Sequence, residues 1–378
     1  MKRVNGKDNQ ENVDGERVRM PRKFTYADAG VDRKLRIESK ESLKILDKTF
    51  RFSHYGEVVQ LPYGNIFALD NDRYLDFVIE GVGTKVLVAQ LARKYSTIGI
   101  DAVAMAVNDV IRSGARPLAV VDNIHAQVSD PGLVQEWLKG VAEGAMEAEC
   151  IVPAGEIGDV AELINGLEDG KGFDMVLASV GEVQKEKIIT GRNVNPGDVV
   201  IGFKSSGIHS NGLSLARKVL FKRWGGRYDP QDVPDGLDRE LVNEVLEPTK
   251  IYVKSLLEAA EMVEVKAAVH ITGDAFLKFT RLASFSKGIG FTLDNFKPPF
   301  IFQLIQKTAR ELGGHITDEE LFKTFNMGWG FAIVVAKKDL DGTLDVVEKT
   351  GTQAEKIGYV TGSEGIKIIY GDKRIFLN

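Results

Sequence analysis

One continuous stretch of this chain, Phe77 to Asp109, constrains the fold and the chemistry more than any other. The run Phe77-Val-Ile79 is β-branched and aromatic, which predicts a buried strand, and Glu80 stands where that strand would end. Gly81-Val82-Gly83 follows, and two glycines at this spacing let a backbone turn sharply and approach a ligand closely. An apolar helical segment begins near Thr84, so the free N–H groups of its first turn could face an anion.

The next helical segment carries polar side chains within an otherwise apolar pattern. Asp101 and Asn108 are seven residues apart, which places them on one helix face, and Asp109 lies beside them. Burying such groups without a partner is costly, and a Mg²⁺ ion that carries nucleotide phosphates would supply one. The pattern therefore indicates a Mg-ATP site. It also fits a simpler interpretation, in which Glu80 is a strand-end charge, Asp109 a solvated helix residue and Asn108 a hydrogen-bonded core amide.

Composition narrows the class of protein. The chain has 378 residues, of which 43% are hydrophobic, and this length predicts two domains. It lacks an apolar run of about eighteen residues, so we expect no membrane span. The net charge of −5, with acids and bases interspersed, argues against nucleic-acid binding. The single cysteine, Cys150, excludes an intramolecular disulfide and a thiolate metal cluster, and the absence of a signal-like start predicts a cytoplasmic location.

Strands that alternate with helices in both halves predict an α/β fold, or α+β layers, without a solenoid repeat. Residues 1–23 are polar and charged, and we expect a disordered extension there. The turn-rich sequence from Gly191 to Gly197 predicts a domain junction. We therefore expect an N-terminal domain over residues 24–190 and a C-terminal domain over residues 191–378.

A polar loop in the second half is a further candidate site. Lys204 to Gly212 combines an imidazole, hydroxyls and an amide just before the helix predicted from Leu213, which suits a phosphate or amide substrate. The alternative is an ordinary loop in which Ser210 or Asn211 caps that helix.

Other predicted features have equally plain alternatives. Glu156 follows a short predicted strand at Ile151-Val152 and is either a second strand-end carboxylate or a turn residue. His270 and Asp274 flank a turn, where a lone histidine is more often structural than catalytic. A further helix is predicted to start at Pro248.

Five collinear segments form a pattern that is shared with a known family. They are Tyr26-Ala-Asp-Ala-Gly-Val-Asp32, Gly99-Ile-Asp-Ala-Val-Ala-Met-Ala-Val-Asn-Asp109, Ile208-His-Ser-Asn-Gly-Leu-Ser-Leu-Ala-Arg-Lys218, Glu247-Pro-Thr-Lys-Ile-Tyr-Val-Lys-Ser255 and Thr324-Phe-Asn-Met-Gly-Trp-Gly330. In them the chain resembles the phosphoribosylformylglycinamidine cyclo-ligases, or aminoimidazole ribonucleotide synthetases, and is most similar to archaeal members. The resemblance runs from about Tyr26 to Gly362.

The resemblance implies a two-domain fold in which the N-terminal domains of two subunits build a shared β-barrel and the C-terminal domain is α/β. It implies that ATP and substrate occupy the cleft between the domains, with Mg²⁺ as cofactor. The implied reaction is the ATP-dependent cyclisation of formylglycinamidine ribonucleotide to aminoimidazole ribonucleotide in purine biosynthesis, with release of ADP and phosphate.

The resemblance also implies roles for individual residues. The implied metal ligands are Glu80, Asp101, Asp109 and Glu156. The other implied nucleotide contacts are Gly81, Val82, Gly83, Thr84, Lys85 and Asn108. The implied substrate contacts are Ser205, Ser206, Gly207, His209, Ser210, Asn211 and Thr272, and the implied catalytic residues are Lys85, His209, Asn211 and His270.

The chain departs from the family pattern at three places in the expected cleft. The family usually reads Thr-Asp at Ile79-Glu80, Gly-Gly-Glu-Thr at Ala154 to Ile157, and Gly-Gly at Asp274-Ala275. If those glycines adopt positive φ, Asp274 and Ala275 would crowd the site. Two alternatives therefore stay open: a diverged ATP-using paralogue, such as a small-metabolite kinase, and a non-catalytic nucleotide-binding dimer.

Overall fold

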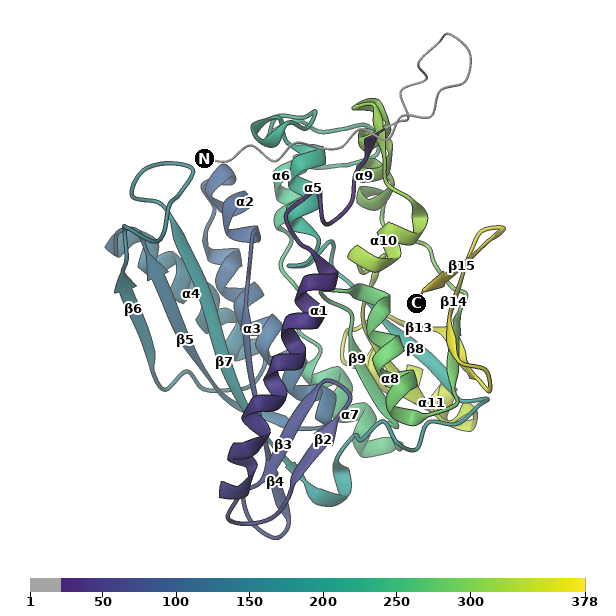
Figure 1. The fold of residues 1–378 in the computed structure, drawn as a ribbon. Helices are drawn as coiled ribbons and strands as arrows, with labels where there is room; N and C mark the ends of the chain where they lie inside the picture. Colours follow the sequence, from purple (N-terminus) through teal and green to yellow (C-terminus); the bar gives the residue numbers. More distant parts are fainter. Residues whose placement is uncertain (1–21, 378) are drawn as a thin grey trace.

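The computed structural model describes residues 22–377, which build two large β-sheets with helices packed on them (Figure 1). This arrangement confirms the predicted α/β layers. The predicted extension lies outside the described residues, except for Arg22 and Lys23. The chain leaves the first sheet after Gln184 and enters the second at Val199, and the predicted junction falls between them. Within residues 22–377, no helix combines the length and the apolar character that a bilayer crossing requires.

The N-terminal sheet has six strands in the order β2-β3-β4-β7-β5-β6. Strand β7 pairs antiparallel with both β4 and β5, whereas the edge strand β6 joins β5 in parallel. The strand predicted at Ile151-Val152 is wrong, because Ile151 forms an isolated bridge to Ala119 and β6 begins later. The strands are β2 (Val58–Leu61), β3 (Gly64–Ala68), β4 (Arg73–Gly81), β5 (Arg116–Ala126), β6 (Gly155–Asp159) and β7 (Phe173–Gln184).

One face of this sheet is covered by helices and the other is open. Helix α3 (Ser96–Val110) packs on β4, β5 and β7, with α2 (Lys85–Ala92) and α4 (Pro131–Glu147) beside it. Helices α3 and α4 touch closely, because a Cβ at Gly140 would lie 1.8 Å from the backbone oxygen of Ser96. On the opposite face, Phe77 and Ile79 are 58% and 71% exposed.

The C-terminal sheet has seven strands in the order β15-β14-β10-β13-β8-β12-β9. Strands β10 and β14 pair in parallel and the other neighbours pair antiparallel. Every residue of β12 is buried, which explains its continuous apolar sequence. The strands are β8 (Val199–Lys204), β9 (Ala267–His270), β10 (Gly290–Leu293), β12 (Trp329–Val335), β13 (Ala354–Thr361), β14 (Gly365–Tyr370) and β15 (Lys373–Leu377).

The structure corrects one predicted helix start and one predicted cap in this half. The helix predicted from Pro248 begins at Val253. The helix predicted from Leu213 does start there, but Gly212 precedes it, so neither Ser210 nor Asn211 caps it. The helices are α5 (Leu213–Leu220), α6 (Leu241–Leu246), α7 (Val253–Met262), α8 (Lys278–Ser286), α9 (Phe300–Glu311), α10 (Asp318–Thr324) and α11 (Leu340–Lys349).

Residues 22–41, which we call the N-terminal arm, connect the two halves. Strand β1 (Arg22–Lys23) pairs in parallel with β11 (Gly314–His315), so the arm starts on the C-terminal domain although its sequence precedes the N-terminal one. Helix α1 (Arg33–Glu41), drawn in purple in Figure 1, is capped by Asp32, whose side chain accepts from the N–H of Leu35. It continues as the 3-10 helix η1 (Ser42–Phe52) toward the N-terminal sheet.

Candidate active site

Strand β4 and the turn after it place the first acidic residues of the site. Because residues two and four apart share a strand face, Asp76 and Glu80 point to the helix-covered side while Phe77 and Ile79 point away. The strand ends at Gly81, and α2 starts after a turn in which Gly83 has a φ of +67°. The strand, turn and helix predicted over this stretch are confirmed. The predicted burial of the strand is wrong, because Phe77 and Ile79 are 58% and 71% exposed.

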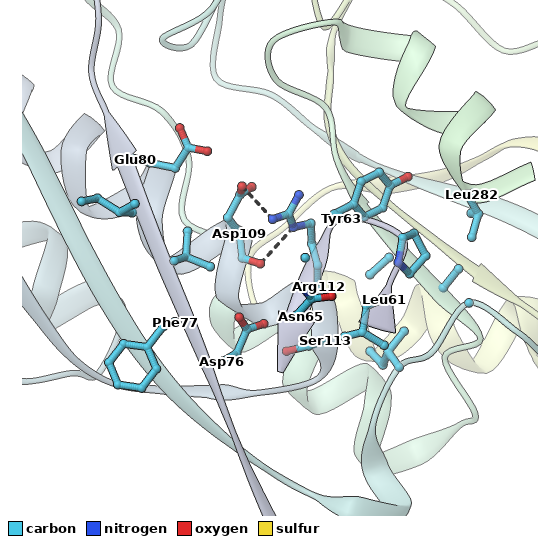
Figure 2. A pocket seen from close by; sticks show the side chains of 18 of the residues that line it. Leu61, Tyr63, Asn65, Asp76, Phe77, Glu80, Asp109, Arg112, Ser113 and Leu282 are labelled. Carbon is cyan, nitrogen blue, oxygen red and sulfur yellow. Dashed lines mark hydrogen bonds and ion pairs between the residues drawn. The ribbon is translucent and has the colours of Figure 1, made fainter. Parts of the chain in front are cut away.

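The carboxyl groups of Glu80 and Asp109 are neighbours on the wall of a cavity of about 430 Å³ (Figure 2). Burial and the charge of Asp109 raise the pKa of Glu80 to about 7. Two ionised carboxylates at close range repel each other, and a cation between them removes that cost. The pair offers two adjacent carboxyl groups, which are ligands of the kind that divalent cations bind.

Asp109 is surrounded by hydrogen-bond donors and cations. Its Oδ1 lies 2.7 Å from Nδ1 of His270, and its Oδ2 lies 2.8 Å from Nη2 of Arg112. Burial alone would raise the pKa of Asp109, but the charges of Arg112 and Lys278 and the hydrogen bond from His270 outweigh it and lower that pKa. Asp109 therefore stays ionised beside Glu80.

The two histidines of the predicted site are buried and neutral. Burial lowers the pKa of His270 to about 4 despite the nearby Asp109. Its Nδ1–H therefore donates to Asp109, which leaves Nε2 without a hydrogen-bond partner among the described residues. Burial also lowers the pKa of His209, whose Nε2 accepts from the N–H of Ser206 at 3.2 Å.

Both domains contribute to the cavity wall. Gly191, Ala267, Ala268 and Leu282 face Glu80 and Asp109 from the C-terminal side, and Figure 2 shows Tyr63 and Arg112 between the acidic pair and Leu282. The remaining lining is mostly apolar, apart from Asn65, Asp76 and Ser113, and burial raises the pKa of Asp76 to about 6.

Lys85 and Asp101, both predicted as nucleotide contacts, bind each other. The Nζ of Lys85 lies 2.8 Å from Asp101 Oδ1 and 2.7 Å from the backbone oxygen of Glu247, and both side chains are fully buried. The same Oδ1 accepts from the backbone N–H and the hydroxyl of Thr249, at 2.7 and 2.6 Å, and from Ser210 Oγ at 3.1 Å. With these partners and no exposed surface, Asp101 joins the two domains. Its Oδ2 lies 2.8 Å from Nζ of Lys85 and accepts no hydrogen bond from the described residues.

Asn108 also holds the segment that follows Glu247. Its Nδ2 donates to the backbone oxygen of Lys250 at 2.8 Å, and its Oδ1 accepts from the N–H of Tyr252 at 2.9 Å. Backbone groups in residues 247–252 are thus used across the domain interface rather than in a helix. This explains why the helix predicted from Pro248 starts five residues later, at Val253.

The polar loop predicted to contact substrate lies between the domains. Ser206 Oγ donates to the backbone oxygen of Pro248, and Asn211 Nδ2 approaches the sulfur of Met105 at 3.8 Å. A Cβ at Gly273 would lie 3.3 Å from Oδ1 of Asn211, so this loop meets the turn that carries Thr272. His209 has a φ of +64°, an uncommon value for a residue other than glycine.

The structure does not bring Glu156 to the other predicted metal ligands of the same chain. Glu80, Leu177, Asp122 and Gly155 form one row across the sheet, so β6 lies roughly 14 Å from β4 at this level. Glu156 is the next residue along β6 and therefore points to the open face, away from Glu80. This corrects the predicted grouping, because one ion cannot be shared across the sheet.

The structure places three further charged residues near the acidic pair, and sequence reasoning missed them. Arg112 follows Asp109 by one helical turn, and Asp76 precedes Glu80 by four strand positions, so both could have been found from periodicity. Lys278 could not, because it comes from α8 of the other domain, where it donates to Thr272 Oγ1. Burial lowers the pKa of Lys278 to about 8, although Asp109 opposes this.

The turn at Asp274-Ala275, where the family usually has two glycines, has the positive φ values that the family pattern suggests. Asp274 and Ala275 have φ values of +71° and +40°, in the region that glycine adopts more easily. The carboxylate of Asp274 pairs with Arg36 of the N-terminal arm.

Family models match both halves of the chain. The model described as AIR synthase related protein, N-terminal domain, matches residues 63–183, and that of the C-terminal domain matches residues 195–371. Among solved structures, Thermotoga maritima PurL complexed with ATP has a TM-score of 0.55 at 14% identity, over 82% of this chain and 44% of that one, so this chain spans less than half of PurL. HypE in the HypE–HypF complex has a TM-score of 0.56 at 16% identity, over 83% of this chain and 92% of that one. Both share the fold.

Curated relatives are similar over nearly the whole chain. The phosphoribosylformylglycinamidine cyclo-ligase of Pyrococcus furiosus is 38% identical over 360 residues, which cover 92% of this chain and 100% of that protein. The cyclo-ligase of Thermococcus kodakarensis is 40% identical over 352 residues, which cover 91% of this chain and 98% of that protein. On these matches, together with the two AIR synthase related domains, the chain belongs to the phosphoribosylformylglycinamidine cyclo-ligase family.

Proposed function

We propose that this protein closes the imidazole ring of aminoimidazole ribonucleotide, using ATP and formylglycinamidine ribonucleotide and releasing ADP and phosphate. The proposal depends on family membership and on one observation in this chain, the adjacent carboxyl groups of Glu80 and Asp109 on the wall of an interdomain cavity. The fold neighbour PurL was solved with ATP and, separately, with FGAR, which supports the use of such ligands by this fold.

The chemistry requires activation of a poor leaving group. The formyl amide oxygen takes the terminal phosphoryl group of ATP, and ADP leaves. The amidine nitrogen then attacks the activated carbon, the C–O bond breaks and phosphate departs with the original oxygen, so the ring gains one C–N bond. Catalysis of this kind rests on positioning and on offsetting negative charge.

Glu80 and Asp109 would hold Mg²⁺. The pair fits that ion, since Mg²⁺ binds through one or two carboxylates together with phosphate oxygens and water. Residues 22–377 contain no cluster of three His, Cys, Asp or Glu side chains placed to hold a metal, so phosphate and water oxygens would complete the coordination. When bound, the ion would offset charge on the phosphate oxygens. The amides of Gly81, Gly83 and Thr84 and the cations Lys278 and Arg112 would assist it. The N–H of Val82, also a predicted contact, is not free for this role, because it donates to the backbone oxygen of Met175 at 3.2 Å.

Other predicted residues would act around this centre. We assign Lys85, Asp101 and Asn108 to domain positioning, because their side chains are used across the interface. His270 would orient Asp109, and its free Nε2 would accept a hydrogen bond from a ligand. Thr272 and the loop residues Ser205, Ser206, Gly207, His209, Ser210 and Asn211 remain proposed substrate contacts.

We propose that the working form is a homodimer and place it in the cytoplasm, as the sequence predicts. The open face of the N-terminal sheet is apolar for a surface: Phe67, Phe77, Ile79, Leu118 and Val121 are between 38% and 71% exposed. A large exposed apolar patch of this kind marks an interaction surface, and a second copy would cover it. Glu156 points to this face, so a dimer would bring it to the interface rather than to Glu80.

The test is to follow ADP and aminoimidazole ribonucleotide together, with Mg-ATP in the presence and absence of formylglycinamidine ribonucleotide. We expect ADP formation that depends on the substrate and matches the aminoimidazole product one to one. ADP formation without that product would favour the kinase-like paralogue. Binding of Mg-ATP without any turnover would favour the non-catalytic dimer and would overturn the proposal.

A further inference from the structure

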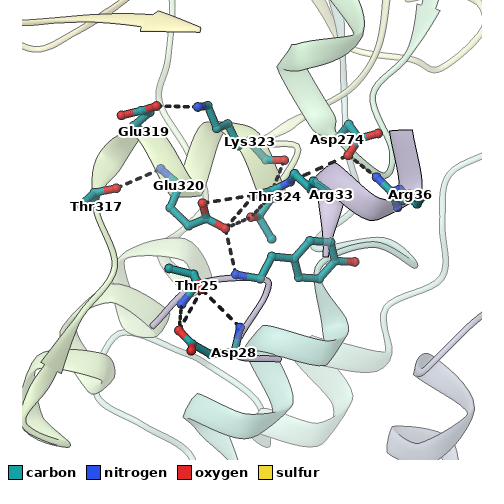
Figure 3. Close-up of polar contacts among 11 residues, drawn as sticks. Thr25, Asp28, Arg33, Arg36, Asp274, Thr317, Glu319, Glu320, Lys323 and Thr324 are labelled. Carbon is teal, nitrogen blue, oxygen red and sulfur yellow. Dashed lines mark hydrogen bonds and ion pairs between the residues drawn. The ribbon is translucent and has the colours of Figure 1, made fainter. Parts of the chain in front are cut away.

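The N-terminal arm is fastened to the C-terminal domain by two arginines in the first turn of α1 (Figure 3). Arg33 Nη1 lies 3.0 Å from Oε1 of Glu320, and Arg33 Nη2 donates to the backbone oxygen of Lys323 at 2.9 Å. Arg36 Nη2 donates to Oδ1 of Asp274, and Arg33 Nε lies 3.8 Å from the same oxygen. Asp274 thus receives both guanidinium groups.

These charged groups are partly withdrawn from water. The side chain of Asp274 is 17% exposed, and those of Arg33 and Arg36 are 18% and 33% exposed. The Nε atoms of both arginines are buried without a hydrogen-bond partner among the described residues. Removal of the Asp274 carboxylate would therefore leave Arg33 and Arg36 partly buried with less opposite charge nearby, which is unfavourable.

Asp274 occupies the turn between two elements that reach the carboxylate pair. Strand β9 ends at His270, which binds Asp109, and α8 begins at Lys278, which lies near both Asp109 and Glu80. The φ of Asp274, +71°, is left-handed, and aspartate and asparagine adopt this region more readily than other side chains.

The arm leads directly into η1, which reaches the cavity. Burial and the nearby Arg281 and Arg36 lower the pKa of Lys40, whereas the carboxylates of Asp274 and Glu80 oppose that shift. Lys40 is thus close enough to Asp274 and Glu80 to interact electrostatically with both carboxylates. Leu43, one turn further, lines the cavity that contains Glu80 and Asp109.

We infer that Asp274 is a positioning residue: its carboxylate holds Arg36 and Arg33, and through α1 it keeps Leu43 in place as the outer wall of the cavity. Asp274 makes this contribution without touching the reacting atoms. Its consequence for nucleotide binding rests on the proposed function, whereas its hold on the arm does not.

Hydrogen exchange of the ligand-free protein tests the hold directly. Asp274→Asn keeps a side chain that tolerates the left-handed backbone and removes the charge. We expect amides in residues 33–41 to exchange ~fivefold faster, which corresponds to about 1 kcal/mol, the upper range for partly exposed ion pairs. Asp274→Gly should loosen the arm equally, although glycine adopts the positive φ at this position with less strain. An effect of Asp274→Gly without one of Asp274→Asn would overturn the inference, because the backbone would then be responsible.

Two further variants make the assignment specific. Glu38→Gln removes a carboxylate of the same helix that pairs only weakly, at 3.9 Å, with the exposed Lys34, and should leave the exchange unchanged. Arg36→Gln should loosen the arm, and adding Asp274→Asn to it should cost less than Asp274→Asn costs alone. Full additivity of the two substitutions would contradict a direct pair.

Steady-state kinetics tests the consequence for the cavity. We expect Asp274→Asn to raise the KM for ATP ~fivefold with kcat within about twofold, since the lost contact acts on binding rather than on chemistry. A fall in kcat with KM unchanged would place Asp274 in the reaction and overturn the inference. If the wild type makes no aminoimidazole product but Asp274→Asn still loosens the arm, the proposed function fails and the positioning role stands.

Discussion

The ammonium nitrogen of Lys85 lies 2.8 Å from the carboxylate of Asp101, and neither side chain has any exposed surface. Lys85 stands at the start of α2 and Asp101 lies on α3. The backbone oxygen of Glu247, which accepts from Lys85, and Thr249, which donates to Asp101, both belong to the C-terminal half. Burial lowers the pKa of Lys85, and Asp101 opposes this by stabilising the charge. Lys85 and Asp101, which the resemblance predicts as ligand contacts, thus hold the two domains together.

We therefore expect Asp101→Asn to destabilise the protein by about 3 kcal/mol, the cost of leaving one charge of a buried pair uncompensated. Urea unfolding at pH 7 measures this. The double variant Lys85→Met with Asp101→Asn should recover part of the loss, because no unpaired charge remains. If Asp101→Asn kept wild-type stability but lost ATP affinity, Asp101 would be a ligand after all.

Mg²⁺ should bind more tightly as the pH rises. Glu80 has a pKa of about 7 and must lose its proton to hold the ion, so affinity should increase about tenfold from pH 6 to pH 8. Thermal shifts with Mg²⁺ alone would report this. Glu80→Gln should abolish the pH dependence, whereas Glu156→Gln, on the opposite face of the sheet, should leave it unchanged. An equal loss in both variants would contradict the single-chain site.

Without metal, Glu80 should make the protein less stable at high pH. Its pKa is raised on folding from 4.5 to about 7, so the folded state binds more protons and stability falls as the pH rises through that window. The loss is up to about 3 kcal/mol. Glu80→Gln should therefore be more stable than the wild type at pH 8 in chelator, and the difference should shrink toward pH 4.5.

His270 should change the pH dependence of stability in the opposite direction, making the protein less stable at low pH. Its pKa is lowered on folding from 6.5 to about 4, so its contribution is complete above pH 6.5 and is lost as the pH falls toward 4. His270→Asn keeps a donor for Asp109 but cannot titrate. Its unfolding free energy should therefore lose up to about 3 kcal/mol less than that of the wild type between pH 6.5 and 4. Parallel pH profiles would mean that His270 is protonated in the folded protein.

The N-terminal core of the site was accessible to sequence reasoning because it is local. The strand before Glu80, the glycine turn and the helix with Asp109 all follow from periodicity within one continuous stretch. In the structure β4 and α3 pack directly on each other, and this contact brings Glu80 and Asp109 together.

The contributions from the second domain were not accessible. Periodicity does not show that Asp109 meets His270 or that Lys278 approaches the acidic pair, because these contacts span more than a hundred residues of chain. It also gave no sign that the segment from Glu247 to Tyr252 is not helical, since its backbone groups are used by residues of the other domain. The resemblance groups Glu156 with Glu80, but the sequence does not reveal which sheet face a later edge strand presents.

The open face of the N-terminal sheet gives the last prediction. Ile79 is 71% exposed there, while Met146, on α4 at the helix-covered side, is 73% exposed and provides a control of equal exposure. If a second copy covers this face, Ile79→Asp buries an unpaired carboxylate in an apolar contact and should shift the protein toward monomer. Sedimentation velocity at several concentrations measures this, and Met146→Asp should sediment as the wild type does. A dimer that survives Ile79→Asp with unchanged affinity would place the interface on another surface.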